Sequence, residues 1–356
     1  PWGARRGGGG LHAVERPKRL HGRRARPKND GHGEGHPLDV SRHLRASALA
    51  AAVFLPVAAS AGPLQPNELG RVMILEYHKV DQPEERWTRT PANFRGDLER
   101  LWERGYRLVA LNDLLDGRIA TSRGTTPVVL TFDDSSPGQF KLIERHGSWV
   151  PDPDCAVGIL EAFERQHPEF GRAATFFVLP GADPPNRLFN QKDLAGRKLQ
   201  YLAAHGYEIG NHTLWHANLA KYPVRVVRQQ LATAQEWVQR HVPGYHIRTL
   251  ALPMGAYPKD IRWAIEGAEG QIAYRHDAVL MVAGGAAPSP HTRAFDPYRL
   301  PRIQALEREL AQWLGYFERN PQERYVSDGD ASVITVPPGT LDKVRRSPGA
   351  RVVERP

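Results

Sequence analysis

The sequence predicts an α/β fold in which parallel strands are connected by helices. Across residues 71–340, short apolar segments typical of strands alternate with longer amphipathic segments typical of helices. This alternation favours helical crossovers between parallel strands, in a barrel or in a doubly wound sheet. No glycine-rich phosphate-binding loop follows any of these strands, which argues against a nucleotide- or dinucleotide-binding fold.

Each expected element rests on periodicity and on helix-breaking residues. Phe94, Leu98 and Leu101 share one helical face, and Gly105 ends that segment. Gly206 ends a second helical segment, and Pro223 begins a third. The expected strands are 71–80, 106–111, 128–132, 174–180, 207–212, 249–253, 277–284, 297–303 and 331–337. The expected helices are 93–106, 156–167, 197–206, 224–242 and 259–270, and the expected loops are 146–158 and 283–297.

Charge and cysteine content narrow the class of protein. The formal net charge is +9, but residues 1–45 hold 11 basic and 4 acidic residues and account for most of it. The remaining chain is nearly neutral, so we expect no nucleic-acid partner. The single cysteine, Cys155, excludes an intramolecular disulfide framework and a cysteine-based zinc cluster.

The beginning of the sequence resembles an export signal. A basic stretch at 42–45 precedes a short apolar run at 46–58 and the small residues Ala59-Ser60-Ala61, so Gly62 is the expected mature N-terminus. The apolar run is shorter than the ~20 residues of a membrane span, so we expect no stable span. This pattern predicts a protein that is secreted or located in the cell envelope.

These features give the expected domain organisation. Residues 1–39 are expected to be a disordered or non-native basic extension, because they are rich in glycine, arginine and proline. Residues 40–61 are the expected signal peptide, and 62–70 a linker. A single catalytic domain is expected over 71–340, followed by an irregular tail over 341–356.

Charged residues follow three of the expected strands. Asp133 and Asp134 end the apolar run 128–132, and His78 follows another apolar strand. His212 and His216 follow a third strand, four residues apart. In α/β barrels, charged residues at the carboxyl ends of strands usually belong to the active site.

The spacing of these residues predicts a metal centre. Within a helical turn, His212 and His216 would lie on one side and could share a cation, with one aspartate as the third ligand. Asp133 and Asp134 point in different directions along a strand, so one can bind the metal while the other takes a proton from the metal-bound water. Aspartate pairs also occur in turns and helix caps, and histidine pairs are often structural. Their coincidence at three strand ends favours catalysis.

Four segments resemble the NodB-homology polysaccharide deacetylases, carbohydrate esterase family 4. The segments TFDD (131–134), NHTLWH (211–216) and ALPMGAYP (251–258) resemble the first three motifs of the family. The segment ILEYHKV (74–80) resembles the N-terminal region of its secreted poly-N-acetylglucosamine deacetylase branch. The likeness extends over 71–303, and it implies a distorted (β/α) barrel that removes acetyl groups from N-acetylated sugars.

The resemblance also implies roles for individual residues. Asp134, His212 and His216 would bind the metal, Asp133 would be the general base, and His78 would be the general acid that protonates the leaving amine.

Three more residues are expected to line the substrate site. The resemblance implies that the backbone N–H of Met254 stabilises the oxyanion, and Tyr257 belongs to the same motif. Ala251 stands where the commoner form of that motif has an arginine that holds the base aspartate. Arg302 is a candidate to supply this guanidinium from a facing strand end, and an ordinary ion pair is the alternative.

The sequence therefore predicts a metal-dependent hydrolase of an N-acetylated glycan, such as peptidoglycan, chitin-like oligomers or poly-N-acetylglucosamine. The expected cofactor is one divalent ion, zinc first, with cobalt, nickel and manganese as alternatives. Trp149 and Trp215 are candidate stacking surfaces for a sugar ring. The alternative functions are an amidase of the same fold that acts on a small non-sugar amide, and a carbohydrate-binding protein without turnover.

Overall fold

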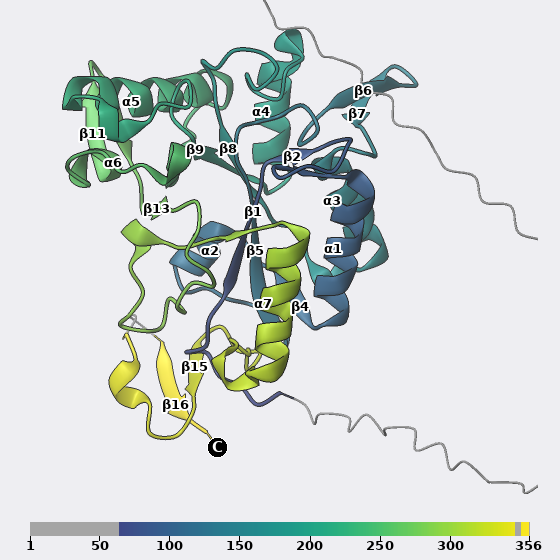
Figure 1. Ribbon diagram of the computed structural model, residues 1–356, viewed down its shortest axis with the longest axis vertical. Helices are drawn as coiled ribbons and strands as arrows, with labels where there is room; N and C mark the ends of the chain where they lie inside the picture. The colour runs from purple at the N-terminus through teal and green to yellow at the C-terminus, as the bar shows by residue number, and fades with distance from the viewer. Residues whose placement is uncertain (1–63, 346–349, 356) are drawn as a thin grey trace, which may run out of the picture. The chain divides into compact units, whose positions relative to one another are not determined.

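A computed structural model describes residues 64–345 and 350–355 of the chain (Figure 1). The expected basic extension (1–39) and signal peptide (40–61) lie outside the described residues, and so does the beginning of the expected linker. Within the described ranges, none of the helices combines the length and the apolar character that a membrane crossing requires.

The described domain is built on an eight-stranded parallel sheet that curls on itself. Its order is β13-β10-β9-β8-β5-β1-β14, and β4 pairs with the beginning of β5. The two ends of the sheet meet where Leu280 of β13 forms a parallel bridge with Leu300, shortly before β14. The strands are β1 Met73–Tyr77, β4 Tyr106–Leu108, β5 Thr126–Phe132, β8 Thr175–Val178, β9 Glu208–Asn211, β10 Thr249–Ala251, β13 Ala278–Leu280 and β14 Ile303–Gln304. The expected distorted (β/α) barrel is confirmed.

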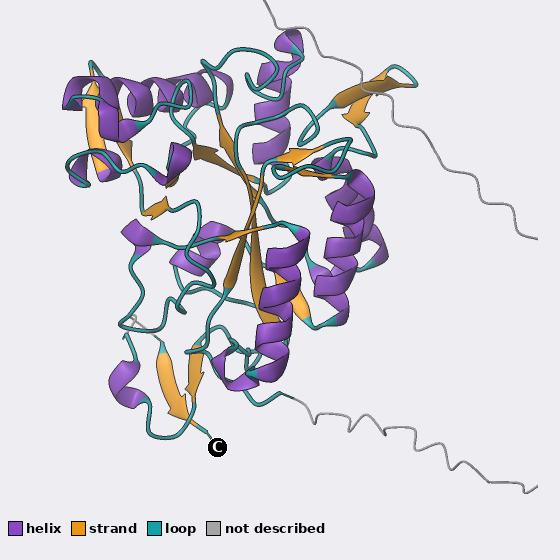
Figure 2. Ribbon diagram, in the orientation of Figure 1, coloured by secondary structure: helices purple, strands orange, loops and turns teal. Residues whose placement is uncertain are grey.

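Helices cover the outside of this sheet (Figure 2). They are α1 Pro91–Glu103, α2 Leu111–Leu115, α3 Ala156–Gln166, α4 Ala195–Ala204, α5 Val224–His241, α6 Arg262–Ile265 and α7 Glu307–Arg319. Thr90 caps α1 by accepting the amide of Asn93 at 3.1 Å. The predicted apolar face of this helix, Phe94, Leu98 and Leu101, is fully buried. Short 3-10 turns are η1 Pro168–Phe170, η2 Lys192–Leu194, η3 Leu219–Lys221, η4 Pro253–Gly255, η5 Pro297–Arg299, η6 Pro321–Glu323 and η7 Leu341–Lys343.

Strands β1 and β5 are buried along their whole length because side chains pack on both of their faces. Tyr77, Phe132 and Phe176 stack across three neighbouring strands, with ring centroids 5.4 and 4.9 Å apart. This packing explains why both strands read as continuous apolar runs. It also gives the residues that follow them a rigid base.

Two segments differ from the prediction because hairpins form in them. The expected helix 259–270 ends after α6, and the chain continues as β11 Glu266–Glu269, antiparallel to β12 Ile272–Arg275. Gly270, with φ of +58°, makes the turn between them. The expected loop 146–158 begins within another hairpin, β6 Leu142–Arg145 and β7 Ser148–Pro151.

The ends of the domain also differ from the prediction. The strand β15 Val333–Val336 stays outside the barrel and pairs with β16 Arg351–Glu354, so the expectation of an irregular tail was wrong for those residues. Asn67 forms a bridge with Val326, and Glu68 is buried, so the end of the expected linker is part of the packed domain. Helix α7 was not predicted. A further pair, β2 Lys79–Val80 and β3 Thr88–Arg89, follows β1.

Candidate active site

The sheet order brings the charged residues together. Strands β1 and β5 are parallel neighbours with Tyr77 opposite Phe132, so His78 and Asp133 emerge at the same edge of the sheet. The amide of Asp133 donates to the carbonyl of Tyr77 at 2.9 Å. Strand β9 ends in the same direction, and His212 follows it directly. The three strand ends therefore form a single site.

Asp134, His212 and His216 form a set of potential metal ligands. The Oδ1 atom of Asp134 lies 3.3 Å from Nε2 of His212 and 3.4 Å from Nε2 of His216. This oxygen is buried and has no hydrogen-bond partner among the described residues. A buried carboxylate oxygen facing two imidazole nitrogens is the arrangement that a cation would satisfy.

The hydrogen bond of His212 determines which of its nitrogens faces the site. Its Nδ1 lies 2.9 Å from the carbonyl oxygen of Ala251 in β10, and a carbonyl can only accept a hydrogen bond. Nδ1 therefore carries a proton, and Nε2, which faces Asp134, is the nitrogen that could bind a metal. The donor set of one carboxylate oxygen and two imidazole nitrogens fits a divalent ion of the zinc type.

A tight turn places the two histidines, in place of the helical turn expected from their spacing. Thr213 and His216 have positive φ values of 69° and 65°. The side chain of Asn211 accepts the amide of Thr213 at 2.8 Å, and the hydroxyl of Thr213 accepts the amide of Ala217 at 2.9 Å. These short-range bonds hold the turn in a conformation that bulky residues rarely adopt.

Arg302 is fully buried beneath Asp133. Its two terminal nitrogens each donate to one carboxylate oxygen of Asp133 at 2.7 Å, in a bidentate pair. The same guanidinium donates to Glu76 at 3.1 Å and to the carbonyl of Met281 at 2.7 Å. A guanidinium with no exposed surface cannot meet substrate, so the expectation that Arg302 binds substrate was wrong. It instead holds both oxygens of Asp133 and so orients that carboxyl group.

The charges and the burial in this cluster shift the pKa values of Asp133 and Glu76 in opposite directions. Burial by itself would raise the pKa of Asp133, but the positive charge of Arg302 outweighs burial and holds that pKa well below its usual range. Burial raises the pKa of Glu76 to about 9, against the opposing charge of Arg302 and with the help of the negative charge of Asp133. At neutral pH, Asp133 is therefore ionised and Glu76 is protonated, which leaves the trio with no net charge.

His78 lies beside this cluster and is mostly buried. Its Nε2 is 3.9 Å from Oε1 of Glu76, and its ring centroid is 4.6 Å from that of Trp87. Burial lowers the pKa of His78 below its usual value, although the neighbouring aspartates oppose this effect. The structure thus places an imidazole and a carboxylate at adjacent strand ends, next to the potential metal ligands.

The third motif occupies the neighbouring strand end. Met254 lies in η4 with φ of 57°, and the residue is 56% exposed. Its segment follows β10, whose residue Ala251 holds His212. The hydroxyl of Tyr257 donates to the carbonyl of Tyr298 at 2.9 Å, which anchors the motif to η5. Trp215, between the two histidines of the potential metal site, and Trp149, on β7, are partly exposed.

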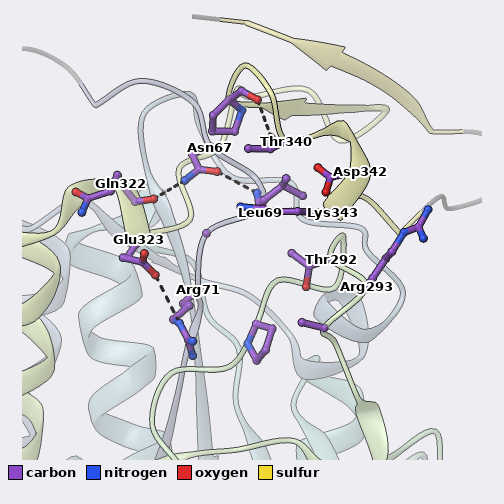
Figure 3. A pocket seen from close by; sticks show the side chains of 14 residues that line it. Asn67, Leu69, Arg71, Thr292, Arg293, Gln322, Glu323, Thr340, Asp342 and Lys343 are labelled. Carbon is purple, nitrogen blue, oxygen red and sulfur yellow. Dashed lines mark hydrogen bonds and ion pairs between the residues drawn. The ribbon is translucent and has the colours of Figure 1, made fainter.

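A separate cavity of about 660 Å³ lies at the opposite end of β1 (Figure 3). Its lining includes Asn67, which donates to the carbonyl of Gln322 at 2.8 Å, and Arg71, which is 3.8 Å from Glu323. Arg71 precedes β1 whereas His78 follows it, so roughly 20 Å of strand separates the cavity from the potential metal ligands. This cavity is not part of the candidate active site.

Comparison with known proteins identifies the domain. Residues 121–272 match the family model described as polysaccharide deacetylase, and this range contains both aspartates and both histidines of the potential metal site. The chain carries a polysaccharide deacetylase domain. His78, Glu76 and Arg302 lie outside the matched range.

A similar protein supports this assignment, and solved structures show the same fold. A chitooligosaccharide deacetylase of a Bradyrhizobium species is 27% identical over 138 residues, which is 39% of this chain and 50% of that protein. This chain therefore aligns with only half the length of that relative. Among solved structures, the deacetylase PplD of Streptococcus pyogenes, in complex with acetate, has a TM-score of 0.51 at 17% identity, covering 70% of this chain and 98% of that one. A polysaccharide deacetylase from Bacillus cereus has a TM-score of 0.51 at 16% identity, covering 69% and 68%. The two structures show the same fold.

Two buried polar residues of this site, Glu76 and Gln139, were not predicted from the sequence. Glu76 had a detectable signal, because it is a carboxylate within the otherwise apolar strand MILEY and lies two residues from His78. Gln139 had none, because glutamines are common in loops.

Proposed function

We propose that this domain is a metal-dependent hydrolase that removes acetyl groups from an N-acetylated glycan such as peptidoglycan, chitin-like oligomers or poly-N-acetylglucosamine. The observation that carries the proposal is the Asp133 carboxyl group, held by a bidentate pair with Arg302 directly beside the set Asp134, His212 and His216. The match to the deacetylase family and the likeness to a chitooligosaccharide deacetylase support a glycan as substrate.

Asp134, His212 and His216 would hold the metal, for which zinc is our first choice. Such an ion, when bound, supplies Lewis-acid activation of water and of an amide carbonyl. The hydrogen bond from Nδ1 of His212 to Ala251 keeps the Nε2 lone pair aimed at the site.

Asp133 accepts the proton of the attacking water. Both of its oxygens are held by Arg302, so the carboxylate keeps one orientation throughout the reaction. His78 donates a proton to the departing amine nitrogen. Its partial burial beside Trp87 excludes bulk water from one face of the imidazole. The backbone N–H of Met254 lies in the third motif, where it would stabilise the developing oxyanion.

The deciding experiment is acetate release from a panel of acetylated glycans. Metal-free protein would be resupplied with zinc, cobalt, nickel or manganese, and small acetylated amides would be tested beside the glycans. We expect metal-dependent release from at least one glycan. The variant Asp133→Asn should keep one equivalent of zinc and lose about 10²- to 10⁴-fold in rate, as for loss of a general base. His212→Ala should lose the zinc.

Other outcomes would redirect the assignment. Release from small amides alone would indicate an amidase of this fold. Glycan binding without any release by the wild type would indicate a carbohydrate-binding protein. Full activity of Asp133→Asn would contradict the role of Asp133.

We further propose that the protein is exported through residues 40–61. The support is the basic stretch, the apolar run and the small residues that end at Ala61. N-terminal sequencing of the protein recovered from outside the producing cell should begin at Gly62, and an intact N-terminus would contradict the proposal.

A further inference from the structure

The segment that follows the two aspartates contains a fully buried glutamine, Gln139. Its amide nitrogen lies 2.5 Å from the backbone carbonyl oxygen of His78. The same nitrogen also donates to the backbone carbonyl of Asp133. A single side chain thus joins the ends of β1 and β5 at the residues that carry the imidazole and the carboxylate.

Chemistry determines the orientation of this amide. Both partners are carbonyl oxygens, which only accept hydrogen bonds, so the NH₂ group of Gln139 must face them. The opposite orientation would place Oε1 against two oxygens. The observed orientation leaves Oε1 buried and without a hydrogen-bond partner among the described residues, which is energetically unfavourable.

The backbone of Gln139 is held as firmly as its side chain. Its amide donates to Ser136 at 3.1 Å, and its carbonyl accepts the amide of Val157 in the first turn of α3 at 3.1 Å. The adjacent Gly138 lies so close to Val80 that an added Cβ would be 1.8 Å from the carbonyl oxygen of that residue. The loop is therefore pressed against the chain that follows His78 and cannot adjust easily.

We infer that Gln139 is a positioning residue that sets the separation of His78 and Asp133. This inference rests on the proposed function, in which Asp133 accepts a proton from the attacking water and His78 donates one to the departing nitrogen. Without the glutamine, the carbonyl of Asp133 would lose this donor, and the carbonyl of His78 would keep only the hydroxyl of Ser136, 3.3 Å away. The two carbonyl oxygens would no longer share a donor, and the strand ends would move apart. A misplacement of about 1 Å can cost about 10²-fold in rate.

The first test compares Gln139→Met with Gln235→Met. Methionine keeps the approximate volume and removes both donors. Gln235 is a matched control because it is also buried, donates to the carbonyl of Tyr245 at 2.8 Å and accepts the amide of Ile247 at 2.9 Å. We expect Gln139→Met to lose about 10²-fold in kcat with KM and zinc affinity nearly unchanged. Gln235→Met should lower the melting temperature and leave kcat per zinc-loaded molecule unchanged.

A second variant gives a signature that general destabilisation would not produce. In Gln139→Glu, the protonated carboxyl can donate to one carbonyl, whereas the carboxylate repels both. We therefore expect its kcat, relative to that of Gln139→Met, to fall as pH rises through the pKa of the new carboxyl group.

These measurements distinguish the inference from the proposed function. Equal kcat values for wild type and a folded, zinc-loaded Gln139→Met would overturn the inference while leaving the deacetylase proposal intact. An inactive wild type would overturn the proposed function, and a crystal structure of Gln139→Met would then decide about Gln139. The backbones of His78 and Asp133 should be farther apart in that structure than in wild type, and unchanged positions would overturn the inference.

Discussion

Replacement of Arg302 by methionine should destabilise the domain in a pH-dependent way. The variant loses both bonds to Asp133 and the bond to Glu76, all of them in the interior. Removal of one partner from a buried ion pair typically costs about 3–5 kcal/mol, because the remaining charge is left without compensation. We expect a loss of that size in the free energy of unfolding at about pH 7.5.

Part of this loss should be recovered in acid. Without the guanidinium, burial raises the pKa of Asp133, so this carboxyl group binds a proton in the folded variant that it does not bind in the unfolded chain. A group with a raised pKa contributes stability at low pH and loses it as pH rises, with a slope of up to about 1.4 kcal/mol per pH unit. Glu76, whose pKa is already about 9, is protonated in wild type at both pH values and does not alter the comparison. The deficit of the variant should therefore be up to about 3 kcal/mol smaller at about pH 5 than at about pH 7.5.

The assay is urea denaturation at both pH values, with Arg324→Met as the control. Arg324 is also buried, but its partners are the hydroxyl of Thr126 and the carbonyl of Arg104, each at 2.6 Å, and the ring of Tyr106. No buried carboxylate depends on it, so the deficit of the control should change little with pH. Equal deficits of Arg302→Met at the two pH values would refute the argument that Asp133 is the uncompensated charge.

Two further predictions concern single titratable groups. If His78 is the acid, kcat/KM should fall as pH rises through the pKa of His78, which burial places below its usual value. The variant His78→Gln should lose about 10²-fold in kcat/KM, and its kcat/KM should no longer show this decrease with pH. If the same decrease of kcat/KM with pH persists in the variant, the general acid is another residue. Glu68 accepts the amides of Thr335 and Asp328, and burial raises its pKa to about 7. The protonated form of Glu68 therefore contributes stability at low pH, and this contribution is lost as pH rises from about 4.5 through about 7. Between about pH 5 and about pH 8, the free energy of unfolding of Glu68→Gln should therefore rise relative to that of wild type by up to about 3 kcal/mol, measured by thermal or urea unfolding. Parallel curves of this free energy against pH would contradict this account.

Local patterns in the sequence were sufficient to predict most of the barrel. Strand β5 and helix α1 were predictable because apolar spacing and breakers act over a few residues. Helix α7 shows the same spacing, at Leu310, Leu314 and Phe317, and could have been found in this way. The pairing of β15 with β16 could not be predicted from the sequence, because a strand's partner depends on how the chain is packed.

The same distinction applies to the candidate site. Asp134, His212 and His216 were predictable as a group because they follow strands of one parallel sheet, whose carboxyl ends share an edge. From the sequence alone, Arg302 could either hold Asp133 or form an ordinary ion pair, because the two residues are 169 positions apart in the chain. The tertiary structure decided that role when β14 paired with β1 and buried the guanidinium beneath Asp133. It also decided the charge states of Glu76 and Asp133, because a pKa depends on burial and on neighbouring charges, which only the folded chain brings together.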